Sequence, residues 1–189
     1  MSGRIVLLRH AEPRVSPDIC YGQLDVALSE SGLKSATASS GQLQPPGRLF
    51  CSDLRRAEES ANLLFPTTTP QVDPRLREVS MGHWEGLRWD DIHSNDQQRM
   101  KLWGQNWISV APPGGESAQQ LFDRTEEFLL QCVPQGRATK GNDEGDTVII
   151  AHQGSLRAIS CLLAGLSVAH FFSTSFSYLA AFTVFDLRS

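Results

Sequence analysis

The sequence predicts an α/β fold built on a largely parallel sheet. Short, continuous apolar runs recur along the 189 residues, and such runs are typical of strands buried on both faces of a sheet. Amphipathic helical segments separate these runs, so strands and helices alternate along the chain. The length suits one sizeable hydrophobic core, and we therefore expect residues 1–189 to form a single domain.

Four segments have the composition of strands. Residues 4–9 (RIVLLR) and 147–152 (TVIIAH) are the clearest, because both are short apolar runs that contain Val and Ile. Residues 48–52 (RLFCS) and 182–187 (FTVFDL) are the other two candidates.

Helix signals separate the strand candidates. The four helices are expected over residues 29–42, 54–64, 117–132 and 155–163. Ser29 is a suitable N-cap for the first helix, and the Pro45-Pro46 pair would end it. Pro66 would stop the second helix, which Ser52 or Asp53 starts. The Gly-containing polar residues 136–146 are expected to form a surface loop.

The charge balance excludes two classes of partner. The 17 Lys and Arg residues against 21 Asp and Glu residues give a formal net charge of -4. The chain therefore has no basic field for non-specific binding of nucleic acid or of an anionic membrane. A local cluster of positive groups would have to hold any anionic ligand.

The cysteines and the N-terminal segment favour a cytoplasmic protein. The four cysteines are far apart, with no Cys-x-x-Cys pair and no histidine at zinc-ligand spacing, so we expect reduced thiols and no metal. The apolar run 5–8 is too short for a secretory signal. Residues 158–185 lack Asp, Glu, Lys and Arg, but they contain eight polar residues. They are expected to form a buried helix, a turn and a strand rather than a membrane span.

Two of the strand candidates end in a histidine, His10 and His152. Ligands of an open parallel sheet bind beyond the carboxyl ends of its strands, so neighbouring strands would bring both imidazoles together. Either histidine alone would be interpreted as a packed or solvated side chain. The repeated placement favours a site.

Arginines near these ends could supply the local positive charge. Arg55 and Arg56 lie in the first turn of a predicted helix, where the helix dipole disfavours a cation unless an anion offsets it. Pairing with Glu58 or Glu59 would explain one of the two arginines. Arg9 adds a second guanidinium beside His10, and two guanidinium groups with two imidazoles suit the oxygens of a phosphate.

Six motifs follow one another along the chain. They are residues 9–12 (RHAE), 51–57 (CSDLRRA), 76–78 (LRE), 82–86 (GHWEG), 113–117 (PGGES) and 152–154 (HQG). In type and order they resemble the motifs of the histidine phosphatase superfamily, also called the phosphoglycerate mutase-like family, over nearly the whole chain. The resemblance implies a three-layer α/β/α fold with a mostly parallel central sheet, and a phosphoryl-transfer enzyme that needs no metal or other cofactor.

By motif match, the resemblance implies that His10 is the nucleophile, that Arg9, Arg56 and His152 bind the phosphate, and that Glu78 donates a proton. A neutral imidazole can attack phosphorus and carry the phosphoryl group, which divides a slow hydrolysis into two in-line displacements. The arginines and a protonated His152 would stabilise the equatorial oxygens. Glu78 would protonate the leaving oxygen and later activate water.

The resemblance also implies a set of substrate-binding residues. The family's first motif commonly has Gly and Thr where this chain has Ala11 and Pro13, which alters the expected phosphate contacts. The family's Asn falls near Ser16. Residues 20–28 (CYGQLDVAL) resemble a segment of α-ribazole phosphatases of cobalamin assembly. The expected binding residues beyond the core site are Ser16, Tyr21, Gly22, Gln23 and Gln153.

All four tryptophans fall between Gly82 and Pro112, in the insertion that covers the active site in this family. We expect Trp84 to pack inside this cover. Trp103 and Trp107 are four residues apart and could line a pocket for an apolar or aromatic leaving group.

The prediction is a phosphomonoester hydrolase for a small-molecule substrate, with α-ribazole 5'-phosphate as one candidate. A phosphoglycerate mutase is an alternative, but it needs extra segments that shield the phosphohistidine and bind a carboxylate, which this short chain is expected to lack. A catalytically weak protein that binds phosphorylated ligands is another, although binding alone requires neither His10 nor Glu78. The sequence leaves a homodimer open.

Overall fold

One five-stranded sheet organises the computed structural model, which describes residues 4–133 and 145–186. The strand order is β3-β2-β4-β1-β5. The strands are β1 (Arg4–Arg9), β2 (Arg48–Cys51), β3 (Gln71–Val72), β4 (Thr147–Ala151) and β5 (Ala181–Asp186). The first four are parallel, and β5 pairs antiparallel with β1 at the edge. The predicted, mostly parallel sheet is confirmed.

Alternation along the central strands explains why both faces of the sheet are covered. Ile5, Leu7 and Ile149 point to one face, where they form a buried cluster with residues of α5 (Ala118–Cys132) and α6 (Gln153–Leu163). Val6 and Leu8 point to the other face and pack with α2 (Arg55–Leu64). Because both sets are apolar, these strands form continuous apolar runs in the sequence.

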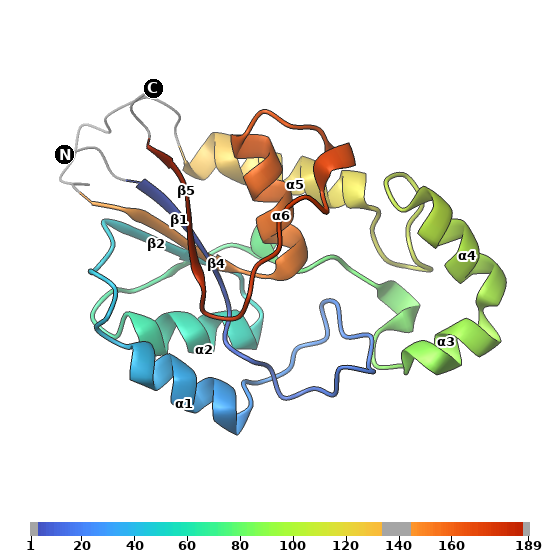
Figure 1. Cartoon of the computed structure of the whole chain (residues 1–189), viewed down its shortest axis with the longest axis horizontal. Coiled ribbons are helices and arrows are strands. Elements are labelled where there is room, and N and C mark those ends of the chain that lie inside the picture. Colours follow the sequence, from blue (N-terminus) through green and yellow to red (C-terminus); the bar gives the residue numbers. More distant parts are fainter. Residues whose placement is uncertain (1–3, 134–144, 187–189) are drawn as a thin grey trace.

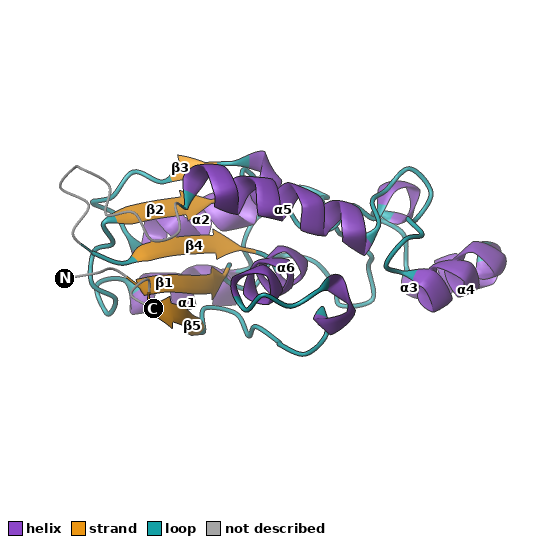
Figure 2. Cartoon of the chain, turned by 90° about the horizontal axis from the view of Figure 1, so that it is seen from above, coloured by secondary structure: helices purple, strands orange, loops and turns teal. Residues whose placement is uncertain are grey.

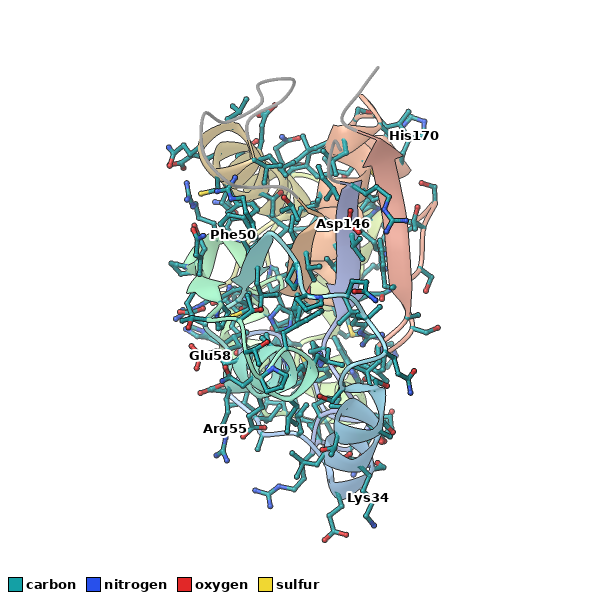
Figure 3. All side chains as sticks on the ribbon, turned by 90° about the vertical axis from the view of Figure 1, so that its left-hand side faces the viewer. Lys34, Phe50, Arg55, Glu58, Asp146 and His170 are labelled. Atoms are coloured by element: carbon teal, nitrogen blue, oxygen red, sulfur yellow. The ribbon has the colours of Figure 1, made fainter. Side chains whose placement is uncertain are left out.

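The helices complete the expected three layers. Helix α1 (Glu30–Ser39) lies beside α2 below the sheet in Figure 1, and α5 and α6 lie above it. Figure 2 shows the same sheet from above, with α5 and α6 in front. In Figure 3, Phe50 lies between the sheet and α5, whereas Arg55 and Lys34 extend outward from the opposite layer. Phe50 packs edge-on against Phe128 of α5, with ring centroids 5.3 Å apart.

The helix boundaries follow from capping. Ser29 caps α1, because its hydroxyl accepts a hydrogen bond from the Gly32 N–H, but the helix ends at Ser39 and not at residue 42. Ser117 and Gln120 form a capping box at the start of α5. Helix α6 begins two residues earlier than expected, directly after His152.

A projecting unit follows the 3₁₀ turn η1 (Pro74–Leu76). It contains η2 (Gly82–Trp84), α3 (Trp89–Asn95) and α4 (Gln97–Asn106), and it stands beyond the carboxyl ends of the parallel strands (Figure 2). As expected, Trp84 packs inside it at 2% exposure, edge-on to Trp103. The projecting unit therefore stands at the edge of the sheet where a ligand of a parallel sheet binds.

The charge-free stretch forms the end of α6, the 3₁₀ turn η3 (Val168–His170) and strand β5, as the sequence predicted. Within residues 4–133 and 145–186, no helix has the length and apolarity to span a bilayer. All four cysteines are unpaired, and three of them are buried. Most of the expected surface loop, residues 134–144, lies outside the described residues.

Candidate active site

The two strand-end histidines lie side by side, as the sequence predicted. His10 follows β1 and His152 follows β4, and these neighbouring parallel strands pair Arg9 with Ala151. The two ring centroids are 4.9 Å apart. His10 is 1% exposed and His152 is fully buried.

A backbone contact fixes the proton of His10. Its Nδ1 lies 2.6 Å from the Ala11 carbonyl oxygen, which can only accept, so Nδ1 carries the proton and donates it. The lone pair is therefore on Nε2. Burial, with the positive charge of Arg56 as the second cause, lowers the pKa of His10 to about 3. The imidazole is neutral at neutral pH, which is the form that can act as a nucleophile.

His152 has the opposite tautomer. The Arg56 Nε–H donates to its Nδ1 at 3.2 Å, so the proton is on Nε2. This Nε2 is buried and has no hydrogen-bond partner among the described residues. Burial and the Arg56 charge hold the pKa of His152 well below its usual value. In this arrangement the ring is therefore a neutral donor. A dianionic phosphate would favour its protonation, so the protonated His152 expected beside a bound phosphate stays a prediction.

Arg56 is the fully buried arginine of the predicted pair. Its two terminal nitrogens donate to the carbonyl oxygens of Leu24 at 2.8 Å and Gly22 at 2.7 Å. Arg55 is exposed and pairs with Glu59 at 2.6 Å. Of the two arginines, Arg55 is thus the solvated one, as expected for one member of the pair.

Arg9 reaches the same cluster from the end of β1. One terminal nitrogen donates to the Phe176 carbonyl oxygen at 3.0 Å, and its guanidinium stacks 4.0 Å from the centre of the Tyr178 ring. Its Nε is buried without a hydrogen-bond partner in the described part of the chain. Arg9 Nε and His152 Nε2 are therefore two buried donors without an acceptor, which a phosphate could supply.

Glu78 lies at the N-terminus of α6. Its carboxylate accepts hydrogen bonds from the Gly154 N–H at 2.9 Å and from the Val79 N–H at 2.8 Å. A carbon added to Gly154 would lie 2.2 Å from Glu78 Oε1, so this glycine permits the contact. The predicted proton donor thus lies beside the residue that follows His152 by two positions.

The predicted residues 21–23 support the charged groups. The ring of Tyr21 lies 5.2 Å from the Arg56 guanidinium, and Gly22 supplies one of the carbonyls above. Gly22 has φ +33, and a side chain there would collide with Glu85. The Gln23 amide donates to the Glu78 carbonyl oxygen at 2.9 Å.

Gln153 and Ser16 lie in different positions relative to the site. Gln153 donates to the Ser175 hydroxyl and accepts from the Phe176 N–H, so it ties α6 to the segment before β5. Ser16 is exposed, and its hydroxyl donates to Asp18. Within the described part of the chain, Ser16 forms no side-chain hydrogen bond with the histidines or arginines of the site. The structure therefore does not bring the Ser16 side chain into the cluster.

Ala11 and Pro13 are both buried. The Ala11 side chain packs with Leu28 and Ala36, and its N–H donates to the Ser60 hydroxyl at 2.9 Å. The methyl group by which Ala11 differs from the family's Gly is therefore directed into the α1–α2 layer.

A cavity of about 510 Å³ adjoins the cluster. Glu78, Gln153 and Gly154 form its inner wall, and Arg157 and Glu116 are its other charged lining residues. Its aromatic lining residues are Trp89, Trp103, Trp107, Phe171 and Phe172. The expectation that Trp103 and Trp107 line a pocket is confirmed. This volume is within the range of small-molecule sites.

Three residues of the site were not identified from the sequence. Tyr178 covers Arg9, and its ring centroid lies 5.6 Å from that of His10. Arg124 pairs with Glu116 at 2.6 Å and donates to the Glu78 carbonyl oxygen at 2.9 Å. Arg157 lines the cavity. For Arg157, its position five residues after His152 on a predicted helix was the available signal.

Comparison with known proteins gives a consistent result. The family model of the histidine phosphatase superfamily (branch 1) matches residues 5–189. Glucosyl-3-phosphoglycerate phosphatase of Mycobacterium tuberculosis (strain H37Rv) is 34% identical over 174 residues, which cover 88% of this chain and 78% of that protein. Metal-independent phosphoserine phosphatase of Arabidopsis thaliana is 32% identical over 164 residues, which cover 82% and 66%.

A further relative by sequence and a solved structure also match this chain. Adenosylcobalamin/alpha-ribazole phosphatase of Salmonella typhimurium (strain LT2) is 29% identical over 171 residues, covering 88% of this chain and 82% of that protein. The solved structure of a mycobacterial glucosyl-3-phosphoglycerate phosphatase superposes with a TM-score of 0.78 at 29% identity, covering 96% and 89% of the two chains.

Proposed function

This chain belongs to the histidine phosphatase superfamily, and from that premise we propose that it hydrolyses small phosphate monoesters through a phosphohistidine formed on His10. The observation that carries the proposal is the tautomer of His10. Its Nδ1–H is held by the Ala11 carbonyl, so the Nε2 lone pair is free in a site with two buried donors that lack an acceptor.

In the first displacement, His10 Nε2 forms a bond to phosphorus while the bond from phosphorus to the ester oxygen breaks. Arg9, Arg56 and the Nε2–H of His152 hold the three equatorial oxygens and stabilise their charge. Glu78, in its protonated form, gives its proton to the departing oxygen, so the leaving group departs as an alcohol.

In the second displacement, water attacks the phosphorus of the phosphohistidine. Glu78, now a carboxylate, takes a proton from this water, and the bond from phosphorus to Nε2 breaks. Phosphate is released, and His10 and Glu78 return to their initial states. Guanidinium and imidazole groups supply the charge stabilisation throughout, so we propose that the reaction is metal-independent.

The cavity beside Glu78 is where the leaving group would lie. Its five aromatic side chains favour a leaving group with a flat ring or an apolar body. α-Ribazole 5'-phosphate, named for one relative, supplies an aromatic base. Glucosyl-3-phosphoglycerate, named for another, supplies a sugar ring, which also stacks on tryptophan.

Trapping the intermediate tests the mechanism. The enzyme is mixed with radiolabelled p-nitrophenyl phosphate, denatured within its first turnovers and analysed for an alkali-stable, acid-labile phosphoryl group. We expect the label on His10 in the parent protein and none in His10→Ala, which should also lose activity while keeping its fold. Activity of His10→Ala within tenfold of the parent would reject His10 as the nucleophile.

The mutase alternative makes a different prediction. It requires transfer of the phosphoryl group to a second hydroxyl of phosphoglycerate in place of release to water. An assay of phosphoglycerate isomers beside phosphate release therefore separates the two activities. We expect phosphate release to dominate.

A further inference from the structure

Arg157 is a partly buried cation in the aromatic wall of the cavity. It projects from α6, and its Nε donates to the Thr174 carbonyl oxygen at 2.8 Å. The guanidinium lies 5.1 Å from the centre of the Phe172 ring and 5.8 Å from that of Phe171. Burial lowers the pKa of Arg157, which reflects the cost of holding this charge away from water.

No carboxylate pairs with Arg157 within residues 4–133 and 145–186. Glu116, the other charged group of the outer wall, is already paired with Arg124 at 2.6 Å. Glu78 acts on Arg157 electrostatically, but its carboxylate is held by the N–H groups of Gly154 and Val79 and forms no ion pair with Arg157. A desolvated guanidinium in apolar surroundings is favourable only when an anion and hydrogen bonds compensate it.

Arg9 and Arg56 also have no ion-pair partner in the described part of the chain, and they surround the position proposed for the phosphate. Arg157 is a third such arginine, on the leaving-group side of Glu78. It lies four residues, or about one helical turn, beyond Gln153, which is a rise of about 6 Å along α6. A group attached a few bonds from the ester oxygen could therefore reach Arg157 while the oxygen stays beside Glu78.

We propose that Arg157 binds a carboxylate of the leaving group, so that the preferred substrates are phosphate esters of hydroxy acids. This proposal rests on the proposed phosphatase function. A planar carboxylate matches the fork of one guanidinium, whereas a phosphate in this site already has several donors. From the sequence, we expected the chain to lack the extra segment that binds a carboxylate in a phosphoglycerate mutase. Arg157 needs no such segment, because it lies on α6. An ester whose leaving group has no carboxylate, such as α-ribazole phosphate, is then a poorer substrate.

Matched pairs of esters test the assignment. 3-Phosphoglycerate and glycerol 3-phosphate differ in one carboxylate, as do phosphoserine and phosphoethanolamine. The parent enzyme should have a higher kcat/KM for the carboxylate member of each pair. Arg157→Gln should reduce that member's kcat/KM by roughly 10- to 100-fold, the range expected for a hydrogen bond between charged groups, and should change the other member by less than about threefold.

Two variants and a binding measurement control for structural effects. Arg157→Lys keeps the charge and should retain part of the preference. Arg99→Gln removes the same charge from an exposed side chain outside this cavity and should leave the ratio unchanged. Glycerate should inhibit hydrolysis of p-nitrophenyl phosphate more strongly than glycerol in the parent, and equally weakly in Arg157→Gln.

The outcomes separate this proposal from the proposed function. Hydrolysis of p-nitrophenyl phosphate with equal kcat/KM values within each pair would overturn the carboxylate assignment and leave the phosphatase intact. An equal loss for both members in Arg157→Gln would also overturn it, since that result indicates a structural role. If no ester at all is hydrolysed, the proposed function fails, and this inference fails with it.

Discussion

Two buried histidines lie in contact and carry their protons on opposite ring nitrogens. A backbone carbonyl fixes the proton of His10 on Nδ1, and a guanidinium fixes that of His152 on Nε2. One ring therefore presents a lone pair and the other presents a donor. Chemically identical side chains thus gain different abilities from one neighbour each.

This arrangement predicts a pH dependence of stability. The folded-state pKa of His10 is about 3 and that of His152 is also lowered, whereas 6.5 is the unperturbed value. The unfolded chain therefore binds more protons between these values, and stability falls as the pH falls below about 6.5. His10 should remove about 2 kcal/mol from the free energy of unfolding between pH 7 and pH 5, and His152 should add a loss in the same direction.

Urea unfolding at both pH values measures this loss. The double variant His10→Gln, His152→Gln should lose less stability on acidification than the parent. Equal losses in the two proteins would contradict the neutral state assigned to the buried histidines.

The role of Glu78 predicts a dependence on the leaving group. Glu78→Gln keeps the acceptor oxygen near the Gly154 N–H but cannot donate the same proton, so alkyl phosphates should be hydrolysed about 10²–10⁴-fold more slowly. p-Nitrophenyl phosphate should be affected less, because its phenolate leaves unaided. Arg56→Ala should slow both esters, since Arg56 is proposed to stabilise the transferred phosphoryl group whatever the leaving group.

The measurement is kcat/KM for a sugar phosphate and for p-nitrophenyl phosphate in both variants. If Glu78→Gln slows both esters equally, Glu78 is not the leaving-group acid. Glu12 or Glu116 would then be the next candidates for that role.

At the scale of elements, helix α6 gathers much of the site. His152 precedes it, the Gly154 N–H in its first turn holds Glu78, and Arg157 lies one turn further along. The positions proposed for the phosphate, the proton donor and the leaving group are thus aligned along one rigid element, and a rigid element supports a precise site better than a loop does.

Gly154→Ala tests this alignment. The added carbon would lie 2.2 Å from Glu78 Oε1 and must displace the carboxylate. We expect kcat for alkyl phosphates to fall at least about tenfold, in line with lost general acid catalysis. The melting temperature should be unchanged or higher, because Ala is a better helix former than Gly. A variant that melts earlier with full residual activity would show that the clash is relieved elsewhere.

The elements also show what the sequence could predict. The buried strands β1, β2 and β4 and the helices α1, α2, α5 and α6 were predictable, because their burial produces apolar runs or periodic apolar faces. Strand β3 was not, since both of its residues are exposed. Helix α4 has no buried residue and therefore no periodic apolar face.

The candidate site divides in the same way. His10, His152 and Arg56 were predictable from strand ends, helix starts and motif order. Tyr178 and Arg124 were not, because their relation to Arg9 and Glu78 arises only when distant segments pack. Ser16 was placed by motif spacing alone, and its side chain lies on the surface.

At the scale of the whole molecule, a protein with a net charge of -4 concentrates positive charge in one buried cluster. Arg9 and Arg56 provide the charge, and neither depends on a bound ion. Hydrolysis of p-nitrophenyl phosphate should therefore persist in excess EDTA at the untreated rate. Loss of activity with recovery on adding Mg²⁺ or Zn²⁺ would indicate a different mechanism.

The projecting unit has a spectroscopic consequence. All four tryptophans of the chain lie between residues 84 and 107, and Trp89, Trp103 and Trp107 line the cavity. The intrinsic tryptophan fluorescence of the protein therefore originates almost entirely around the proposed leaving-group pocket. A ligand that enters the pocket should change the emission without any attached label, so stopped-flow fluorescence can time the arrival and departure of the leaving group separately from the chemistry at His10.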